Sequence, residues 1–213
     1  MNIKLFSAAL LATSIASAAT PIDGWYASVF GGYSYLPDNV SAVWNGLFFN
    51  GTTYDNGYNV GGRVGYQSNP IRYELEYTYL TATNSGFAID FVPQTDNIYG
   101  NSSGNVIMAN IYYDFPDMLP AISPFLGVGI GYASLQASLS STAPFGGGFV
   151  SISENMFSYQ ATVGMTYNFA ENYAMNLSYR FLATSQGGDF GRVFQADMAN
   201  IGGVFRFDKG SYK

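Results

Sequence analysis

Cysteine and histidine are both absent from the 213-residue chain, and each absence excludes a class of chemistry. Without cysteine there is no thiolate nucleophile and no thiolate metal ligand. Without histidine there is no side chain that titrates near neutral pH unperturbed and serves as the general base of a triad. Nucleophilic triads and the usual zinc and thiol sites are therefore excluded. We expect a protein that is not an enzyme, with no catalytic residue, no cofactor and no metal.

Charge and long hydrophobic runs are also scarce. Charged residues make up 10% of the chain, whereas ordinary soluble domains contain about 25%, so a water-facing surface would be hard to cover. The net charge of −6 argues against a nucleic-acid partner. The longest charge-free stretch, residues 118–153, is interrupted by Pro120, Pro124 and Pro144, which argues against a membrane helix.

The first segment has the pattern of an export signal. Lys4 precedes a short apolar run over residues 5–15, and the small residues Ala16-Ser17-Ala18 follow it, as signal peptidase requires. An uncleaved anchor helix is the alternative, but the run is shorter than the roughly 20 residues that span a bilayer. We predict that residues 1–19 are a cleaved signal peptide and that residues 20–213 form a single domain.

The rest of the chain alternates with a period of two. In residues 71–79, Tyr73 and Leu75 lie on one side of an extended chain, and Glu74 and Glu76 lie on the other, which indicates a strand. Each such run is long enough for a tilted membrane strand of about 9–11 residues. The eight runs are residues 24–35, 58–67, 70–80, 105–115, 123–135, 156–169, 173–182 and 194–207.

The connections between these runs alternate between short and long. Those at 68–69, 116–122 and 170–172 are short, and the other four are long and rich in Gly, Asn, Ser and Asp. Short turns on one side and long loops on the other are typical of outer-membrane barrels. We predict an all-β fold: a transmembrane, antiparallel, up-and-down barrel of eight strands with short periplasmic turns and four long extracellular loops.

A soluble, lipocalin-like barrel would show the same period with the faces reversed. Three features favour the membrane barrel. The polar face consists mostly of small uncharged residues, aromatics such as Tyr33, Tyr77 and Phe169 lie near strand ends, and the last strand closes with the aromatic-ended segment 203–207. Interfacial aromatic girdles are expected at such positions.

The predicted strands place charged side chains on one face. A two-residue loop at Ser68-Asn69 would set Arg63 opposite Glu74 and Arg72 opposite Gly65. The predicted lumen charge network consists of Arg63, Arg72, Glu74, Glu76, Arg180 and Arg206.

Two interpretations of this network remain open: a narrow ion path or a neutralising plug. We favour the plug, because eight strands enclose just enough room for side chains and unpaired charges there would be costly. The alternative is a narrow pore for small solutes or hydrophobic ligands. It is suggested by five glycines on the inward face that would leave room for water: Gly61, Gly65, Gly127, Gly129 and Gly131.

The first two of the four long loops contain aromatic clusters. The loop over residues 36–57 carries Trp44, Phe48 and Phe49, and the loop over 80–104 carries Phe87 and Phe91. Exposed aromatic clusters can contact host proteins or lipopolysaccharide. The alternative interpretation, which the sequence supports equally, is that the strands continue beyond the membrane and that these side chains pack on one another as a cap.

Taken together, the signal, the eight strands, the four long loops and the aromatic-ended last strand resemble the eight-stranded outer-membrane barrels of the opacity and outer-membrane-protein-A type of Gram-negative bacteria. The resemblance covers the whole mature chain. It implies an outer-membrane location, contact with membrane lipid and lipopolysaccharide, and recognition of Phe205 and Phe207 by the barrel assembly machinery. It further implies a surface antigen, adhesin or envelope-structural role with a possible host ligand. We expect a monomer.

Overall fold

The computed structural model describes residues 23–37, 42–44, 47–89, 92–94, 99–115, 122–141, 148–185 and 193–207. The predicted signal peptide, residues 1–19, and the candidate contact residue Phe91 lie outside these ranges. Within them, no helix has both the length and the apolar character needed to cross a membrane.

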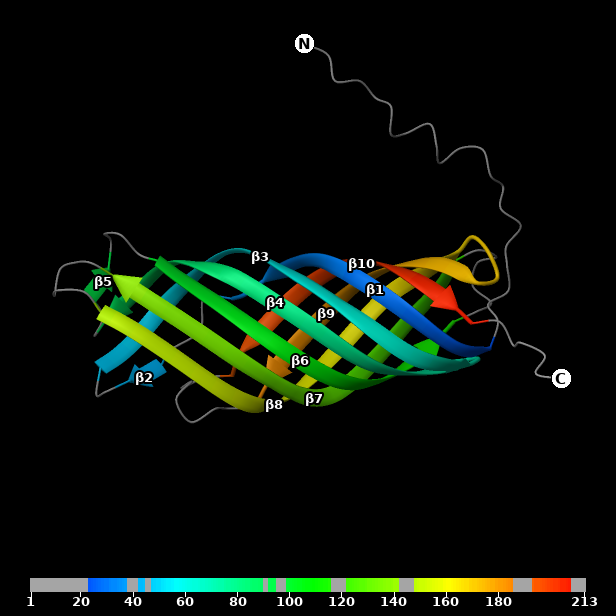
Figure 1. Cartoon of the computed structure of the whole chain (residues 1–213), viewed down its shortest axis with the longest axis horizontal. Helices are drawn as coiled ribbons and strands as arrows, with labels where there is room; N and C mark the ends of the chain where they lie inside the picture. Colours follow the sequence, from blue (N-terminus) through cyan, green and yellow to red (C-terminus); the bar gives the residue numbers. More distant parts are fainter. Residues whose placement is uncertain are drawn as a thin grey trace, which may run out of the picture.

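The described residues form ten β-strands. Eight of them pair antiparallel with their neighbours along the chain, and pairing of the first with the last closes the ring (Figure 1). The predicted closed eight-stranded barrel is therefore confirmed. The barrel strands are β1 (Gly24–Tyr35), β3 (Leu47–Ser68), β4 (Ile71–Ile89), β6 (Tyr99–Asp114), β7 (Ile122–Ser141), β8 (Gly148–Asn168), β9 (Tyr173–Thr184) and β10 (Gln195–Arg206). The short strands β2 (Ala42–Trp44) and β5 (Val92–Gln94) pair with the far ends of β3 and β4.

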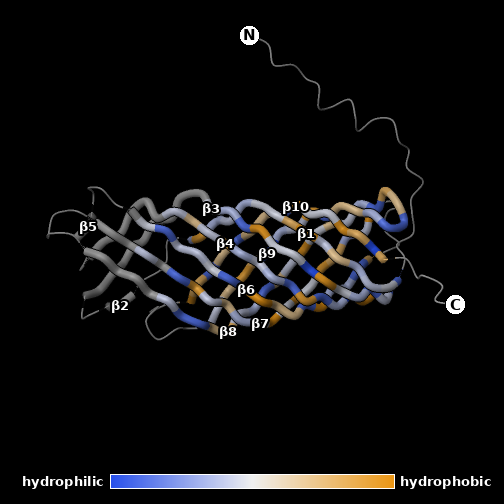
Figure 2. The backbone as a smooth tube through the Cα atoms, viewed as in Figure 1, coloured by the Kyte–Doolittle hydropathy of each residue, from blue (hydrophilic) through white to orange (hydrophobic). Residues whose placement is uncertain are grey.

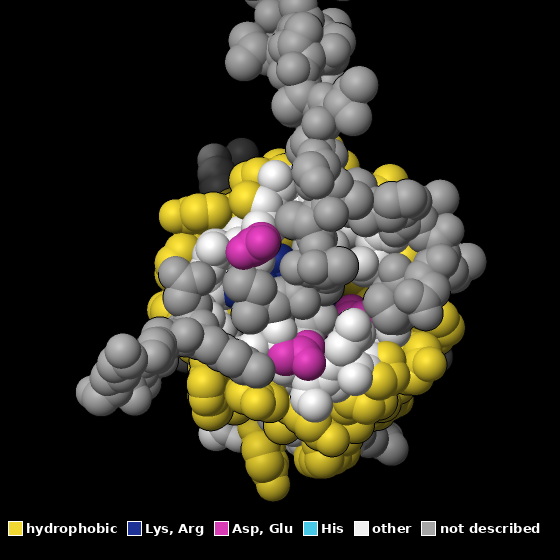
Figure 3. Space-filling model, turned by 90° about the vertical axis from the view of Figure 1, so that its right-hand side faces the viewer, with side chains coloured by type: hydrophobic (Ala, Val, Ile, Leu, Met, Phe, Trp, Pro, Cys, Tyr) yellow, Lys and Arg dark blue, Asp and Glu magenta, His cyan; other side chains and the backbone are white. Residues whose placement is uncertain are grey.

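Apolar side chains face outward along the half of the barrel next to the short turns. On β9, Tyr173 and Leu177 are 51% and 54% exposed, whereas Asn176 and Arg180 are buried. Seen from the short-turn end, hydrophobic side chains form a ring around the outside of the barrel, and acidic and basic side chains are visible within this ring (Figure 3). In Figure 2, hydrophobic and hydrophilic residues are interspersed along the strands in this half of the barrel. A soluble barrel with the reverse orientation does not fit this half.

The register of the hairpin between β3 and β4 differs from the prediction by two residues. The turn is Asn69-Pro70, so Arg63 pairs with Glu76 and Arg72 pairs with Gln67; the predicted partners, Glu74 and Gly65, were wrong. Proline has no N–H to donate to a strand ladder, so it belongs in the turn rather than in β4. A shift of two residues preserves the faces, which is why the charged side chains still point inward.

Five strands extend well beyond the predicted ends. Strands β3, β4, β6, β7 and β8 have 16 to 22 residues, whereas β1, β9 and β10 have 12 each. These five strands form a wall that projects past the other three on the left of Figure 1. Much of the two predicted loops, 36–57 and 80–104, is therefore strand, in agreement with the interpretation in which the strands continue beyond the membrane.

The chemistry of the two faces is exchanged toward this projecting end. Outward residues there are polar and exposed, as at Asn105 on β6, Gln136 on β7 and Asn155 on β8. The inward residues form an apolar cluster, which we call the apolar cap. Its members are Leu36, Leu80, Ala82, Val106, Met108, Ala133, Leu135, Met156, Leu182, Phe194, Ala196 and Met198.

The apolar cap shows that the inward face of the barrel is apolar toward the projecting end. The start of the last strand takes part in it. Ala196 and Met198 point into the cap, and Gln195 is exposed. An apolar inside with a polar outside is the arrangement of a β-barrel in water. The projecting end therefore has the surface of a structure that is surrounded by water.

Candidate functional site: the charged lumen

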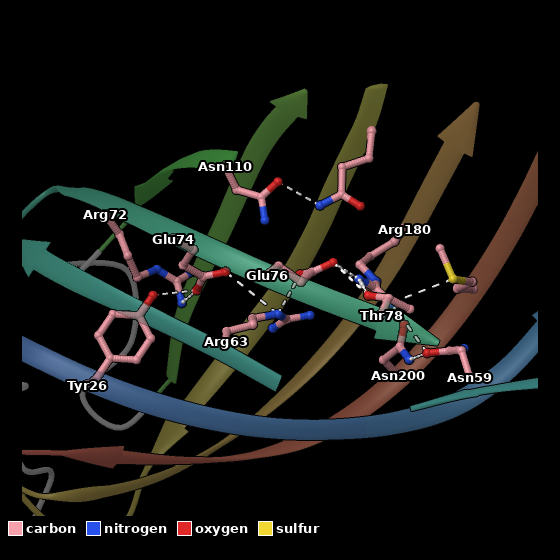
Figure 4. Close-up of polar contacts among 12 residues, drawn as sticks. Tyr26, Asn59, Arg63, Arg72, Glu74, Glu76, Thr78, Asn110, Arg180 and Asn200 are labelled. Atoms are coloured by element: carbon pink, nitrogen blue, oxygen red, sulfur yellow. Dashed lines mark hydrogen bonds and ion pairs between the residues drawn. The ribbon is translucent and has the colours of Figure 1, made fainter. Parts of the chain in front are cut away.

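Glu76 lies at the centre of one group of charged side chains in the lumen (Figure 4). Its Oε2 accepts a hydrogen bond of 2.7 Å from Arg63 Nε, and its Oε1 forms an ion pair with Arg180 Nη1. Arg180 is fully buried and also donates to Asn200 Oδ1 over 3.0 Å and to Asn59 Oδ1 over 3.3 Å. One carboxylate thus joins arginines from β3 and β9 across the barrel.

Glu74 forms a second group nearer the short turns. Its Oε1 accepts hydrogen bonds from Tyr26 OH and, over 3.2 Å, from Arg72 Nη1. Arg72 Nη2 also lies 3.2 Å from Asp114 Oδ1. Arg63 Nε lies 3.6 Å from Glu74 Oε2 and so links the two groups.

The arginines are also covered by aromatic rings. The guanidinium carbon of Arg72 lies 4.6 Å from the ring centroid of Tyr112 and 4.7 Å from that of Phe125. Arg63 and Arg180 lie 4.1 Å and 4.6 Å from the ring of Phe30. Such cation–π contacts stabilise desolvated cations.

The structure brings Arg63, Arg72, Glu74, Glu76 and Arg180 together, but it leaves Arg206 apart. Arg206 Nη2 donates to Asn168 Oδ1 over 2.8 Å, and no ion pair joins Arg206 to a carboxylate among the described residues. The sequence reasoning did not identify four partners of the network: Tyr26, Asn59, Asp114 and Asn200. Asp114 carried a usable signal, because it shares the inward parity of Tyr112 and Asn110 on β6.

The inward glycines are sites of close packing and do not leave open space. Gly127, Gly129 and Gly131 on β7 pair directly with Tyr112, Asn110 and Met108 on β6, whose side chains cover them. Phe30 and Tyr26 on β1 cover Gly61 and Gly65 on β3 in the same way. These five glycines therefore do not support the predicted thread of water.

This packing predicts a large difference between two glycine substitutions. A Cβ atom at Gly131 would lie 1.9 Å from the carbonyl oxygen of Ile107 and 2.7 Å from Met108 Sδ, whereas a Cβ atom at Gly203 would meet nothing within 4 Å. We expect Gly131→Ala to lower the free energy of unfolding by about 1–3 kcal/mol through overpacking. Gly203→Ala should be neutral or slightly stabilising. Urea unfolding in lipid vesicles measures both, and equal effects would contradict the packing account.

The candidate contact residues have their backbones in the projecting wall. Trp44, at the end of β2, pairs with Leu47 on β3, and Phe48 pairs with Val43. Phe49 of β3 pairs with Ile89 of β4, and Phe87 of β4 pairs with Gln94 of β5. These residues are therefore carried on paired strands.

Phe205 and Phe207 lie in an aromatic row at the short-turn end. Their ring centroids are 5.4 Å apart, and Phe205 lies 5.1 Å from Tyr173, which stacks on Phe169. The N–H of Phe207 donates to the carbonyl of Trp25 over 3.0 Å, which ties the end of the last strand to the first. Rows of outward aromatic residues at a barrel end are typical of a membrane interface.

Residues 5–207 match the model of the outer membrane protein β-barrel domain family. The chain belongs to this family. Outer membrane protein PagN of Salmonella typhimurium is 27% identical over 161 residues, which are 72% of this chain and 63% of PagN. The match thus spans less than two thirds of that relative.

Membership of the family places this barrel in the outer membrane. The short turns of such barrels lie in the periplasm.

Two solved barrels share the fold. Neisserial surface protein A superposes with a TM-score of 0.53 at 17% identity, over 86% of this chain and 97% of that one. OprG of Pseudomonas aeruginosa gives a TM-score of 0.55 at 13% identity, over 89% of this chain and all of that one. The described part of the barrel holds no group of three or more acidic side chains that could bind a metal ion.

Proposed function

We propose that this outer-membrane barrel is a non-enzymatic, non-conducting surface protein that presents its projecting wall to molecules outside the cell. The observation that carries the proposal is that the polar and apolar faces of the strands are exchanged toward the projecting end, beyond the band of outward apolar residues. Outward Asn105, Gln136 and Asn155 and the inward apolar cap make the projecting strands a folded structure in water. Anchorage in the membrane does not require five strands to extend past the lipid. The extension instead holds the surface of the projecting wall away from the lipid.

Two layers of the lumen support a barrel that does not conduct. The buried ion network lies in the half next to the short turns, and the apolar cap lies toward the projecting end. An ion crossing the barrel would need to separate Glu76 from two arginines and then enter an apolar core, and both steps are costly.

Planar-bilayer recordings of refolded protein test the closed lumen. We expect no reproducible unitary conductance, because an ion would have to separate buried ion pairs and then cross an apolar layer. Reproducible openings that change in Glu74→Ala would show that the network lines an ion path, and the narrow pore would then replace the plug. An empty-detergent preparation controls for artefactual currents.

Contact with a host ligand is tested on the aromatic residues of the wall. Aromatic side chains dominate the energy of many interfaces, and Trp44, Phe48 and Phe49 lie on paired strands at its far end. We expect replacement of all three by Ser to reduce binding of expressing bacteria to cells or matrix by about tenfold or more. Gln136→Ala, on the polar flank of the wall, is the matched control. Unchanged binding in the triple variant, at equal surface level, would remove these residues from the proposal.

Export and assembly complete the proposal. Residues 1–19 would be removed after export, and the barrel assembly machinery would recognise the last strand through Phe205 and Phe207. The aromatic row of Phe205, Phe207 and Tyr173 supports this placement at the periplasmic interface.

A further inference from the structure

The outward faces of β6, β7 and β8 carry a block of uncharged polar side chains just beyond the lipid-facing band. These three strands lie side by side in the projecting wall (Figure 1). Strand pairing aligns two cross-strand rows, which we call the neutral patch: Asn105, Ser134 and Asn155, and then Ser103, Gln136 and Ser153. The three amide side chains are all exposed. The patch is therefore accessible from outside the barrel.

The neutral patch contains no charged residue, although ordinary soluble domains contain about 25% charged residues. Asn101 and Ser138, which pair with each other one row further out, are uncharged as well. A charged side chain is costly to remove from water, whereas a hydroxyl or an amide exchanges its hydrogen bonds with water for others at little net cost. A polar partner can therefore cover the patch without a large desolvation penalty.

The chain has almost no cations with which to bind anions at the projecting end. The four arginines that the structure describes are all buried in the lumen. The connections at the projecting end, residues 36–46, 90–98, 142–147 and 185–194, contain four acidic residues and one cation: Asp38, Asp90, Asp96, Asp189 and Arg192. Phosphate and sulfate groups are recognised mainly by Arg and Lys. The described outer surface therefore lacks the groups that would bind lipid phosphates or sulfated sugars.

The neutral patch does not have the composition of a protein interface either. Its six residues include no aromatic residue, methionine or arginine, the types that are enriched in such interfaces. Hydroxyl and amide side chains can both donate and accept hydrogen bonds, and sugar hydroxyls have the same capacity. Asn105 Oδ1 accepts a hydrogen bond of 2.7 Å from Tyr77 OH, which leaves its Nδ2 to donate. The patch therefore matches an uncharged saccharide surface.

We propose that the neutral patch binds the sugar headgroup of the outer-leaflet glycolipid, lipopolysaccharide, through sugar hydroxyls and not through phosphates. The glycolipid is favoured over a glycan of another cell, because the patch continues directly from the lipid-facing band. Two residues closer to the membrane, the next cross-strand row consists of the exposed residues Ile107, Tyr132 and Phe157. A step of two residues along a tilted strand corresponds to a height of about 5 Å. The patch thus begins where acyl chains give way to headgroups, and its contact is independent of host binding at the far end of the wall.

The test uses the full barrel, labelled with ¹⁵N and refolded in dodecyl maltoside. The side-chain NH₂ signals of Asn105, Gln136 and Asn155 are assigned by replacing each residue with Ser. The probe is the core oligosaccharide of lipopolysaccharide, freed of its acyl chains. It is titrated with its phosphates and after their removal, and dextran is titrated as an unrelated saccharide, all at matched ionic strength.

We expect the three amide signals to shift saturably with the oligosaccharide, to the same extent with and without its phosphates. The Nδ2 signal of Asn200, which donates to Asn59 Oδ1 inside the lumen, is the internal control and should not move. Gln136→Ala should weaken the binding measured at Asn155 by about threefold or more, because one hydrogen-bonding side chain is lost.

The proposal is overturned if the signals of the neutral patch do not respond, respond only to the phosphorylated form, or move in parallel with Asn200. An equal response to dextran would also overturn it, because the patch would then have no preference for the glycolipid. Unchanged binding in Gln136→Ala would remove the patch from the contact.

Discussion

Glu76→Gln is expected to lower the free energy of unfolding by about 3–5 kcal/mol, because it leaves buried cations without their counter-charge. Glu76 pairs with both Arg63 and Arg180, and all three side chains are at most 2% exposed. Glutamine has nearly the same shape, so the loss reports charge rather than volume. The neighbouring Glu74 lies 3.6 Å from Arg63 Nε but has no ion pair with Arg180, so it cannot replace Glu76.

Urea unfolding in lipid vesicles, followed by the heat-modifiable gel mobility of the barrel, measures this loss. Glu171→Gln makes the same chemical change on the exposed short turn between β8 and β9, and surface changes of this kind fall within about 0.5 kcal/mol. If the two variants unfold at the same urea concentration, the ion network contributes little to stability. Arg63 and Arg180 would then have to be neutralised in another way.

The faces of the barrel were predictable from the sequence, whereas the partners within the lumen were not. A period of two fixes the side to which Arg63, Glu74 and Glu76 point, whatever the register. The particular pair, Arg63 with Glu76, depends on Pro70 lying in the turn, and a shift of two residues leaves the period unchanged. Arg180 reaches Glu76 only because the ring closes, and they are 104 residues apart in the chain.

The extent of the projecting wall was not predicted for a related reason, although continuation of the strands beyond the membrane was one of the two interpretations left open. Strand ends were placed where outward apolar residues stop, as after Tyr79 on β4 and before Ile107 on β6. Beyond the predicted ends the alternation continues with its chemistry exchanged: on β6, Gly104 and Ser102 point inward while Asn101 points outward. A pattern that combines polar outward residues with small or apolar inward ones resembles a loop when only the outward face is considered. At those positions the surroundings of the strand change from lipid to water, and the strand itself continues.

The same exchange predicts losses of different size for one substitution at two outward positions of β7. Val128 is 58% exposed within the apolar band, and Gln136 is exposed beyond it. We expect Val128→Arg to lower the free energy of unfolding by about 2–4 kcal/mol, because a charge must enter the hydrocarbon, and Gln136→Arg by about 1 kcal/mol at most. Urea unfolding in vesicles measures both. Similar losses would place both residues in one medium and would contradict a wall that stands in water, since strand, side and introduced charge are the same in the two variants.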